Sequence, residues 1–167
     1  MEPRSKSRSK SRPQLIAAGG VVIRVMDETS PNIDSVEVVV CKRSSESLCA
    51  LPKGKPIDGE SLQETALREV REETGLEVRI QESLGHIDYQ FTQTDGGLEF
   101  DKKVHFYLMA SSGGDIDLHD DEFDQVEWVR VSTASRQLTH ATEVRVLGRA
   151  VAIVTGRASD TGNPVGQ

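Results

Sequence analysis

Residues 54–76 read GKPIDGESLQETALREVREETGL, and this stretch decides the fold. Ser61 followed by Glu64 three residues later is a capping-box pattern, which is typical of the start of a helix. Gly75 suits the left-handed conformation that often ends one. The stretch therefore predicts a helix over residues 62–74.

Three glutamates of this predicted helix, Glu69, Glu72 and Glu73, are spaced i, i+3 and i+4, so they occupy neighbouring positions on its surface. Glu69 and Glu73 flank the apolar stripe that faces the body. The alternative is a solvated acidic face paired with Arg68 and Arg71. We expect both arginines to project away from Glu69 and Glu73. Carboxylates clustered without a cation favour Mg²⁺ or Mn²⁺, which prefer hard oxygen ligands.

The same 23 residues resemble the signature box of the Nudix family, with every defining position filled. The residues that carry the resemblance are Gly54, Glu60, Arg68, Glu69, Val70, Glu72, Glu73, Gly75 and Leu76. Membership implies an α/β fold, a Nudix α/β/α sandwich in which a mixed β-sheet lies between helices. It also implies that the box forms a loop-helix-loop catalytic element, in which Glu60 has a supporting role.

The resemblance also implies roles for individual residues. Glu69, Glu72 and Glu73 would be catalytic residues and metal ligands, and the backbone carbonyl of Lys53 would add a ligand. Arg68 would be a catalytic residue that orients the glutamates. Metal ions held in this way cancel phosphate charge and lower the pKa of a bound water, so water can attack phosphorus.

Many Nudix relatives recruit one more carboxylate from a distant loop, as a metal ligand or as a general base. This sequence offers Asp120, Asp121, Glu122, Asp124 and Glu127. Glu122 is favoured, because residues 121–123 followed by 127–129 are similar to the loop-then-strand pattern of members that act on dinucleoside polyphosphates. The alternative is a solvated acidic loop. The sequence leaves open whether Glu69 or Glu122 activates the water.

Basic residues outside the box point to a substrate class. The segment LPKG at residues 51–54 and the pair Lys102-Lys103 are similar to diadenosine polyphosphate (Ap4A-type) hydrolases, in which basic side chains approach the polyphosphate. Lys53, Lys102 and Lys103 are therefore candidate substrate-binding residues. Paired lysines also keep an edge strand soluble, which is the alternative for the last two.

Three aromatic residues, Tyr89, Phe91 and Tyr107, are candidate stacking partners for a base, with core packing as the alternative for each. The leading expectation is a hydrolase that cleaves a phosphoanhydride bond in a diadenosine polyphosphate such as diadenosine tetraphosphate (Ap4A). Three alternatives are MutT-like removal of pyrophosphate from oxidised nucleoside triphosphates, removal of pyrophosphate from RNA 5′ ends, and a Nudix-fold binding module without catalysis.

The length of 167 residues, with 36% hydrophobic residues, predicts one domain. Residues 1–13 alternate Ser with Arg or Lys and carry a net charge of +4, so we expect a disordered basic tail with an alternative role in weak contact with RNA. The Nudix domain would span residues 14–156, and residues 157–167 would be frayed. The whole chain has a net charge of −7, so residues 14–167 carry a net charge of −11. An acidic domain of this kind disfavours binding to a phosphate backbone.

No apolar stretch approaches the roughly 20 residues that cross a bilayer, and no apolar region follows the N-terminal basic residues. We therefore expect a cytoplasmic protein that acts on a small nucleotide and binds no membrane. Cys41 and Cys49 lack metal or redox spacing and are predicted to be reduced thiols.

Patterns of β-branched and aromatic residues predict strands at 15–25, 36–42, 77–84, 87–92, 103–110 and 125–131. Apolar residues at helical spacing predict a second helix over 142–155, ended by Gly156. Residues 27–34, 95–97 and 111–121 are rich in turn formers and are expected to be loops.

Overall fold

The computed structural model describes residues 12–92 and 96–160. Its elements in chain order are β1 (Gln14–Val25), β2 (Val36–Arg43), β3 (Leu48–Ala50), β4 (Lys53–Gly54), α1 (Leu62–Thr74), β5 (Leu76–Thr92), β6 (Glu99–Gly114), β7 (Gln125–Arg130), α2 (Val131–Gln137) and α3 (Ala141–Asp160). Short 3₁₀ turns at 33–35, 44–46 and 116–118 lie in the connections.

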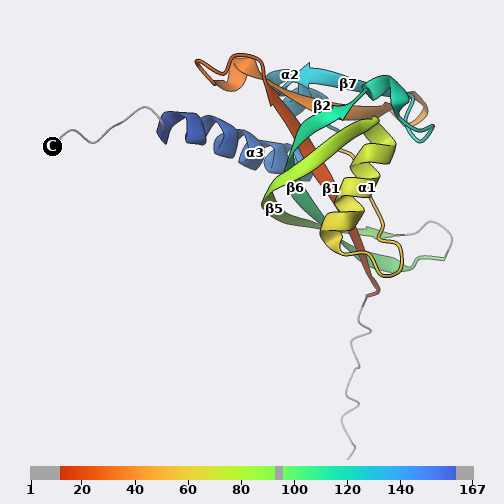
Figure 1. The fold of residues 1–167 in the computed structure, drawn as a ribbon. Helices are drawn as coiled ribbons and strands as arrows, with labels where there is room; N and C mark the ends of the chain where they lie inside the picture. Colours follow the sequence, from red (N-terminus) through yellow and green to blue (C-terminus); the bar gives the residue numbers. More distant parts are fainter. Residues whose placement is uncertain (1–11, 93–95, 161–167) are drawn as a thin grey trace, which may run out of the picture.

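The strands form one sheet of seven strands, and it is a mixed sheet, as predicted (Figure 1). Its hydrogen-bonded order is β3-β2-β1-β6-β5, with β4 also paired to β1 and β7 to β2. β1 and β6 run parallel, whereas the other pairs are antiparallel. The central strand β1 therefore links the two halves of the sheet and runs beside the short strand β4, where the box begins.

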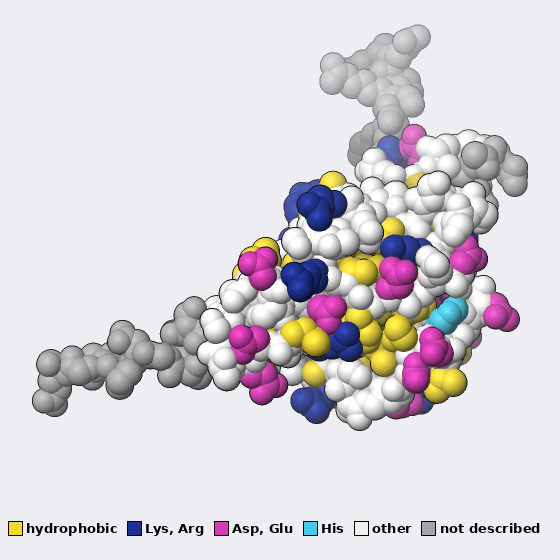
Figure 2. Space-filling model, turned by 90° about the horizontal axis from the view of Figure 1, so that it is seen from above, with side chains coloured by type: hydrophobic (Ala, Val, Ile, Leu, Met, Phe, Trp, Pro, Cys, Tyr) yellow, Lys and Arg dark blue, Asp and Glu magenta, His cyan; other side chains and the backbone are white. Residues whose placement is uncertain are grey.

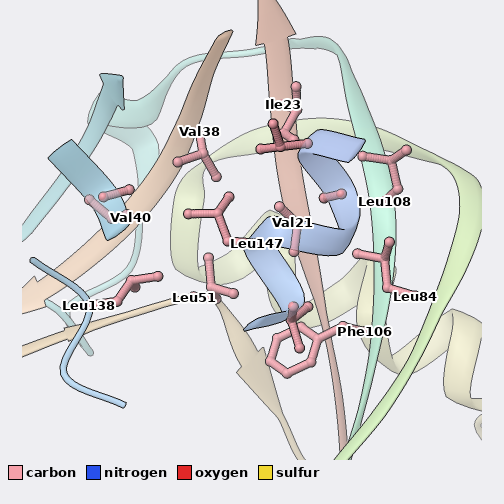
Figure 3. Close-up of a cluster of buried hydrophobic side chains, with 14 of the residues drawn as sticks. Val21, Ile23, Val38, Val40, Leu51, Leu84, Phe106, Leu108, Leu138 and Leu147 are labelled. Atoms are coloured by element: carbon pink, nitrogen blue, oxygen red, sulfur yellow. The ribbon is translucent and has the colours of Figure 1, made fainter. Parts of the chain in front are cut away.

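Helices cover both faces of the sheet, which confirms the predicted α/β/α arrangement. On one face, Val70 of α1 packs in the same buried cluster as Val22. On the other face, Leu147 of α3 is buried in a second cluster beside Val21 and Val38 (Figure 3). Adjacent residues of β1 thus point into opposite clusters. A strand buried on both faces reads as a continuous apolar run, and this explains the sequence of β1.

Two predicted strand boundaries are wrong. Residues 77–84 and 87–92 form one strand, β5, rather than two. The pairing with β6 shifts register between Ser83 and His86, and Gly85 has φ +78 there, so a bulge takes up the irregularity without ending the strand. β6 continues to Gly114, into residues expected to be a loop, because its backbone stays paired with β5 up to Leu76.

The second helix is longer than predicted. α3 runs from Ala141 to Asp160 and continues through Gly156, which was expected to end it. A single glycine weakens a helix by only about 1 kcal/mol and need not end it. The short elements β3, β4 and α2 were not predicted, because each is too short to show a period in the sequence.

The predicted basic tail falls mostly outside the described residues, as do residues 161–167. Its last two residues contact the start of β6. The Pro13 carbonyl accepts the Asp101 N–H at 3.1 Å, and Arg12 Nη2 lies 2.6 Å from Glu99 Oε2. Residues 12 and 13 are therefore in contact with β6.

The surface carries mixed charge. Figure 2 shows hydrophobic side chains gathered near the middle of one face, with Lys and Arg side chains standing between Asp and Glu side chains around them. None of the described helices is long and apolar enough to span a membrane.

Cys41 and Cys49 are both free and buried. Cys41 lies within β2, as predicted.

Candidate active site

α1 is fixed at both ends, with the bounds predicted from the sequence. Ser61 Oγ accepts the N–H of Glu64 at 3.1 Å. At the other end Gly75 adopts φ +77, and its N–H donates to the Arg71 carbonyl. A Cβ on Gly75 would lie 2.2 Å from the carbonyl oxygen of Asp115, so no side chain fits there. This anchoring holds the glutamates of α1 in place over the sheet.

Three carboxylates meet at this helix. One oxygen from each of Glu69, Glu73 and Glu122 lies within 4.8 Å of the other two. The side chains of Glu69 and Glu73 are 13% and 1% exposed, whereas that of Glu122, from the loop between β6 and β7, is 51% exposed. The fold thus brings the favoured downstream carboxylate to two of the box glutamates.

Other candidate acids lie elsewhere. Glu72 is outside the cluster: its side chain is 47% exposed and accepts a hydrogen bond from Arg68 Nη1 at 3.3 Å. Among the other downstream candidates, Asp124 accepts the Ser44 N–H at 2.7 Å and Glu127 pairs with Lys42 at 2.8 Å. These two acids stabilise the β2–β7 region and are not part of the cluster.

Arg68 was expected to project away from Glu69, and this is wrong. Its Nη1 donates to Glu69 at 2.9 Å, and its Nε and Nη2 donate to the two oxygens of Glu60 at 2.7 and 2.9 Å. Spacing along the helix gave the wrong answer because the long guanidinium folds back to the loop that precedes the helix. The bidentate bonds from Arg68, followed by the Ile57 N–H, lower the pKa of Glu60 to about 2.

The cluster holds more negative charge than its neighbours compensate. Burial, followed by the charge of Glu122, raises the pKa of Glu73 to about 9. Burial also raises the pKa of Glu69, although Arg68 opposes this. Crowded carboxylate oxygens whose pKa values stay elevated despite the nearby Arg68 are hard ligands for a further cation. The residues present therefore fit a divalent metal ion of the kind that Nudix hydrolases generally use.

Gly54 is required by the position of Glu69. A Cβ at residue 54 would lie 2.1 Å from Glu69 Cδ and 2.3 Å from both carboxylate oxygens. The obstructing atoms are the end of a flexible side chain, so a larger residue would displace the carboxylate rather than unfold the protein. The glycine of the box thus leaves space for the carboxylate of Glu69.

We expect Gly54→Ala to lower kcat/KM by about tenfold to thirtyfold, a loss of roughly 1.4–2 kcal/mol of transition-state stabilisation, because Glu69 is displaced. The melting temperature should change little. Gly148→Ala is the matched control, because nothing lies within 4 Å of its added Cβ. Steady-state kinetics and thermal melts of both variants test the expectation, and a Gly54→Ala protein with normal kinetics contradicts it.

A cavity of about 430 Å³ adjoins the cluster. Its lining includes all three clustered carboxylates and four basic residues, Arg43, Lys53, Lys55 and Lys102. Burial, followed by the charges of Lys53 and Lys55, lowers the pKa of Lys102. Mutual repulsion among these lysines indicates a region that favours an anion.

Arg43 was missed in the sequence, since it belongs to no recognisable motif, and Lys55, although it lies in the box, was not named as a substrate contact. Arg43 donates from Nε and Nη2 to the carbonyl of Glu122, at 3.0 and 2.9 Å. Its guanidinium also lies 4.9 Å from the centre of the Phe123 ring. Arg43 therefore holds the loop that carries Glu122.

A second cavity, of about 390 Å³, shares Lys53 with the first. Tyr89, Phe91 and His140 line it. The rings of Tyr89 and His140 are nearly parallel, at 13°, with centres 6.5 Å apart. Lys102 Nζ lies 5.6 Å from the centre of the Tyr89 ring. Two predicted stacking candidates thus line a common cavity next to the acidic cluster.

The remaining predicted substrate contacts are placed differently. Tyr107 is 7% exposed and packs in the core cluster under α1, which is the alternative that the sequence allowed. Lys103 Nζ lies 3.9 Å from Asp88 and lines neither of the two cavities. Lys53 Nζ is bonded to Glu143 at 3.0 Å, so its ammonium group is already paired.

A family model of the NUDIX domain matches residues 16–149. The chain belongs to the Nudix family. The match runs from β1 into α3 and includes the whole box, so the glutamate cluster and both cavities lie within the Nudix domain.

Two curated relatives are similar in sequence. A Mycobacterium tuberculosis protein named mutator protein MutT4 is 36% identical over 162 residues, and an 8-oxo-(d)GTP phosphatase of Mycolicibacterium smegmatis is 35% identical over 145 residues. The alignments cover 94% and 85% of this Nudix chain. They span only 64% and 43% of the two relatives.

Solved structures share the fold. An Ap4A hydrolase of C. elegans, solved as a binary complex, matches with a TM-score of 0.63 and 20% sequence identity. The match covers 85% of this chain and 98% of the C. elegans chain. A Nudix hydrolase from Nitrosomonas europaea has a TM-score of 0.61 at 16% identity, over 86% and 91% of the two chains. These likenesses confirm the Nudix fold predicted from the box.

Proposed function

We propose that this Nudix chain is a metal-dependent hydrolase that cleaves a phosphoanhydride bond in a nucleoside polyphosphate. The observation that carries the proposal is the meeting of Glu69, Glu73 and Glu122 in a cavity that Lys55 and Lys102 also line. The carboxylates offer hard oxygen ligands for Mg²⁺ or Mn²⁺. The ammonium groups attract the phosphate chain to the same cavity.

We propose a separate role for each residue at the cluster. Glu69, Glu73 and Glu122 would hold the metal, and Glu72 would join them only by leaving Arg68. When bound, a divalent cation supplies charge neutralisation for the phosphates and acidifies the attacking water. Arg68 keeps Glu69 in position through their 2.9 Å bond. Either Glu69 or Glu122 accepts the proton that the water releases.

Lys53 has two proposed roles. Its N–H donates to Glu73 at 3.0 Å, which places its backbone at the cluster, and we propose its carbonyl as a further ligand. Its side chain lines both cavities, so a polyphosphate that enters both would pass close to it. Lys102 also lies where the two meet, because it lines the first cavity and contacts Tyr89 of the second.

The first candidate substrate is a dinucleoside polyphosphate such as Ap4A, because Lys53 and Lys102 lie where the two cavities meet and could contact a long phosphate chain. A planar base between two parallel rings needs a separation of roughly 7 Å, twice the contact distance of about 3.5 Å. The centres of the Tyr89 and His140 rings lie 6.5 Å apart and their planes differ by 13°, so a base in this cavity would lie against at least one ring face. A base in the second cavity would leave the phosphate chain directed past Lys53 into the acidic cavity.

A second candidate is MutT-like hydrolysis of an oxidised nucleoside triphosphate to a monophosphate and pyrophosphate. The names of the two mycobacterial relatives, mutator protein and 8-oxo-(d)GTP phosphatase, favour it. One nucleotide would fill the same two cavities. The choice between the candidates therefore depends on the products formed.

Incubation of the purified protein and Mg²⁺ with Ap4A, 8-oxo-dGTP and triphosphorylated RNA, followed by chromatography of the products, tests the proposal. Comparison of kcat/KM ranks the substrates. ATP and AMP formed from Ap4A and water at the highest kcat/KM support the first candidate. Preferential pyrophosphate release from 8-oxo-dGTP selects the second, and turnover that persists in EDTA refutes both.

A further inference from the structure

Glu143, in the first turn of α3, is a buried carboxylate outside the Nudix box. Its side chain is 1% exposed, which it shares with Glu73 and with no other acidic residue of the described part of the chain. Burial of a charged group costs several kcal/mol unless partners compensate it. A carboxylate retained at such a position needs a structural or functional reason.

One oxygen of Glu143 binds two groups of the loop before α1. Glu143 Oε1 accepts the N–H of Leu51 at 3.2 Å and the ammonium of Lys53 at 3.0 Å. Within the described residues, its Oε2 is buried and has no hydrogen-bond partner. The carboxylate of Glu143 therefore binds the loop before α1 through a single oxygen, Oε1.

The same loop ends on the metal-binding cluster. The N–H of Lys53 donates to Glu73 Oε2 at 3.0 Å. The Pro52 carbonyl accepts the N–H of Gly20, which fixes the other side of the loop to β1. Glu143 and Glu73 thus bind opposite parts of one residue, Lys53, the first through its side chain and the second through its backbone.

We propose that Glu143 is a positioning residue for the metal site, acting through Lys53 to hold the carboxylate of Glu73. This inference rests on the proposed function, because it concerns the site that would bind the cation. Glu143 also connects α3, which lines the second cavity, to the glutamates of α1. A shift of α3 relative to the loop would then move Glu73.

Three substitutions of Glu143 separate the effect of side-chain length from the effect of charge. Glu143→Gln keeps the length of the side chain and an oxygen that accepts from Leu51 and Lys53, but loses the charge. Glu143→Asp keeps the charge but is one methylene too short to hold both donors. Glu143→Ala loses both properties. Arg145→Ala, which removes an exposed charge from the same helix, is the matched control.

The readout is Mn²⁺ affinity without substrate, measured by titration calorimetry, together with kcat, KM and the melting temperature. Loss of a residue that orients a metal ligand typically weakens affinity by about 10- to 100-fold, and we expect this for Glu143→Asp and Glu143→Ala. Glu143→Gln should stay within about threefold of the wild type, with kcat affected more than KM in the other two.

Two results would overturn the inference. Normal Mn²⁺ affinity in all three variants, even with lower melting temperatures, reduces Glu143 to a structural link between α3 and the loop. A normal Asp variant beside a weakened Gln variant would overturn positioning by a side chain of the right length, because the negative charge of Glu143 alone would then account for the effect on the site. If Glu143→Ala fails to fold, the Gln and Asp pair still decides. Unchanged Mn²⁺ affinity in Glu73→Gln would instead remove the metal site itself, and with it the proposed function.

Discussion

Replacing Glu73 by Gln is expected to lower kcat/KM by about 10³-fold or more, at unchanged fold. A metal ion contributes several kcal/mol to charge stabilisation in phosphoryl transfer, and each 1.36 kcal/mol is a factor of ten in rate. Gln has the same shape and can still accept the N–H of Lys53, so the loop keeps its bond. Steady-state kinetics with Mg²⁺ and with Mn²⁺ measure the loss.

Glu64→Gln provides the control for this change. It makes the same substitution on the same helix, at an exposed residue outside the carboxylate cluster. The control should retain wild-type kinetics. Comparable turnover by Glu73→Gln would mean that the buried carboxylate does not take part in the reaction, and the proposed site would be wrong.

Glu73 also predicts how stability depends on pH when no metal is bound. Its pKa is about 9 in the folded state, against about 4.3 for an ordinary Glu in an unfolded chain. The folded state therefore holds a proton that the unfolded state releases. The stability from this difference is fully present below about pH 4.3 and is lost as the pH rises towards 9.

In EDTA, Glu73→Gln should therefore be more stable than the wild type at pH 8, by at least about 2 kcal/mol or roughly 5 °C in melting temperature. At pH 4 the two proteins should differ much less. Thermal melts across this pH range measure both quantities. A wild-type protein whose melting temperature is not lowered relative to the variant as pH rises would contradict the raised pKa.

The part of the site on α1 could be predicted because it is local. Helix spacing fixes the positions of Glu69 and Glu73 once Ser61 and Gly75 mark the ends of the helix. Glu122 was favoured by resemblance alone, since nothing in a sequence says which of several loop acids folds back onto a distant helix. The structure places it at the cluster because the loop after β6 passes the end of α1, where Asp120 N–H bonds the Glu72 carbonyl.

The contacts that could not be predicted join residues far apart in the chain. Arg43 at the end of β2 binds the Glu122 backbone, and Glu143 of α3 binds Lys53. Neither pair has a spacing rule, because sheet pairing and helix docking bring them together. The position of Arg68 relative to Glu69 was misjudged for a related reason, and its bonds to Glu60 were not predicted. Helix geometry fixes where a side chain leaves the backbone, but the end of a long side chain is placed by the partners that it binds.

Glu122→Gln is expected to lower kcat by about 10²- to 10³-fold, the range that general bases and metal ligands contribute. Arg43 donates two hydrogen bonds to the backbone carbonyl of Glu122 and lies 3.9 Å from its carboxylate, so the loop should keep its two shorter bonds to Arg43 in the variant. Asp121→Asn is the matched control: an exposed acid in the same loop, outside the carboxylate cluster. Its kinetics should match the wild type.

Mn²⁺ titration of the same Glu122 variant separates its two proposed roles. A large loss of kcat with nearly normal Mn²⁺ affinity would assign Glu122 as the group that accepts the proton from water, and Glu69 would then serve mainly as a ligand. A parallel loss of affinity and kcat would assign Glu122 as a ligand and leave Glu69 as the base. If Glu122→Gln and Asp121→Asn both changed kcat and Mn²⁺ affinity only slightly, the exposed carboxylate of Glu122 would lie near the cluster without taking part in the reaction. The site would then consist of the glutamates of α1 alone.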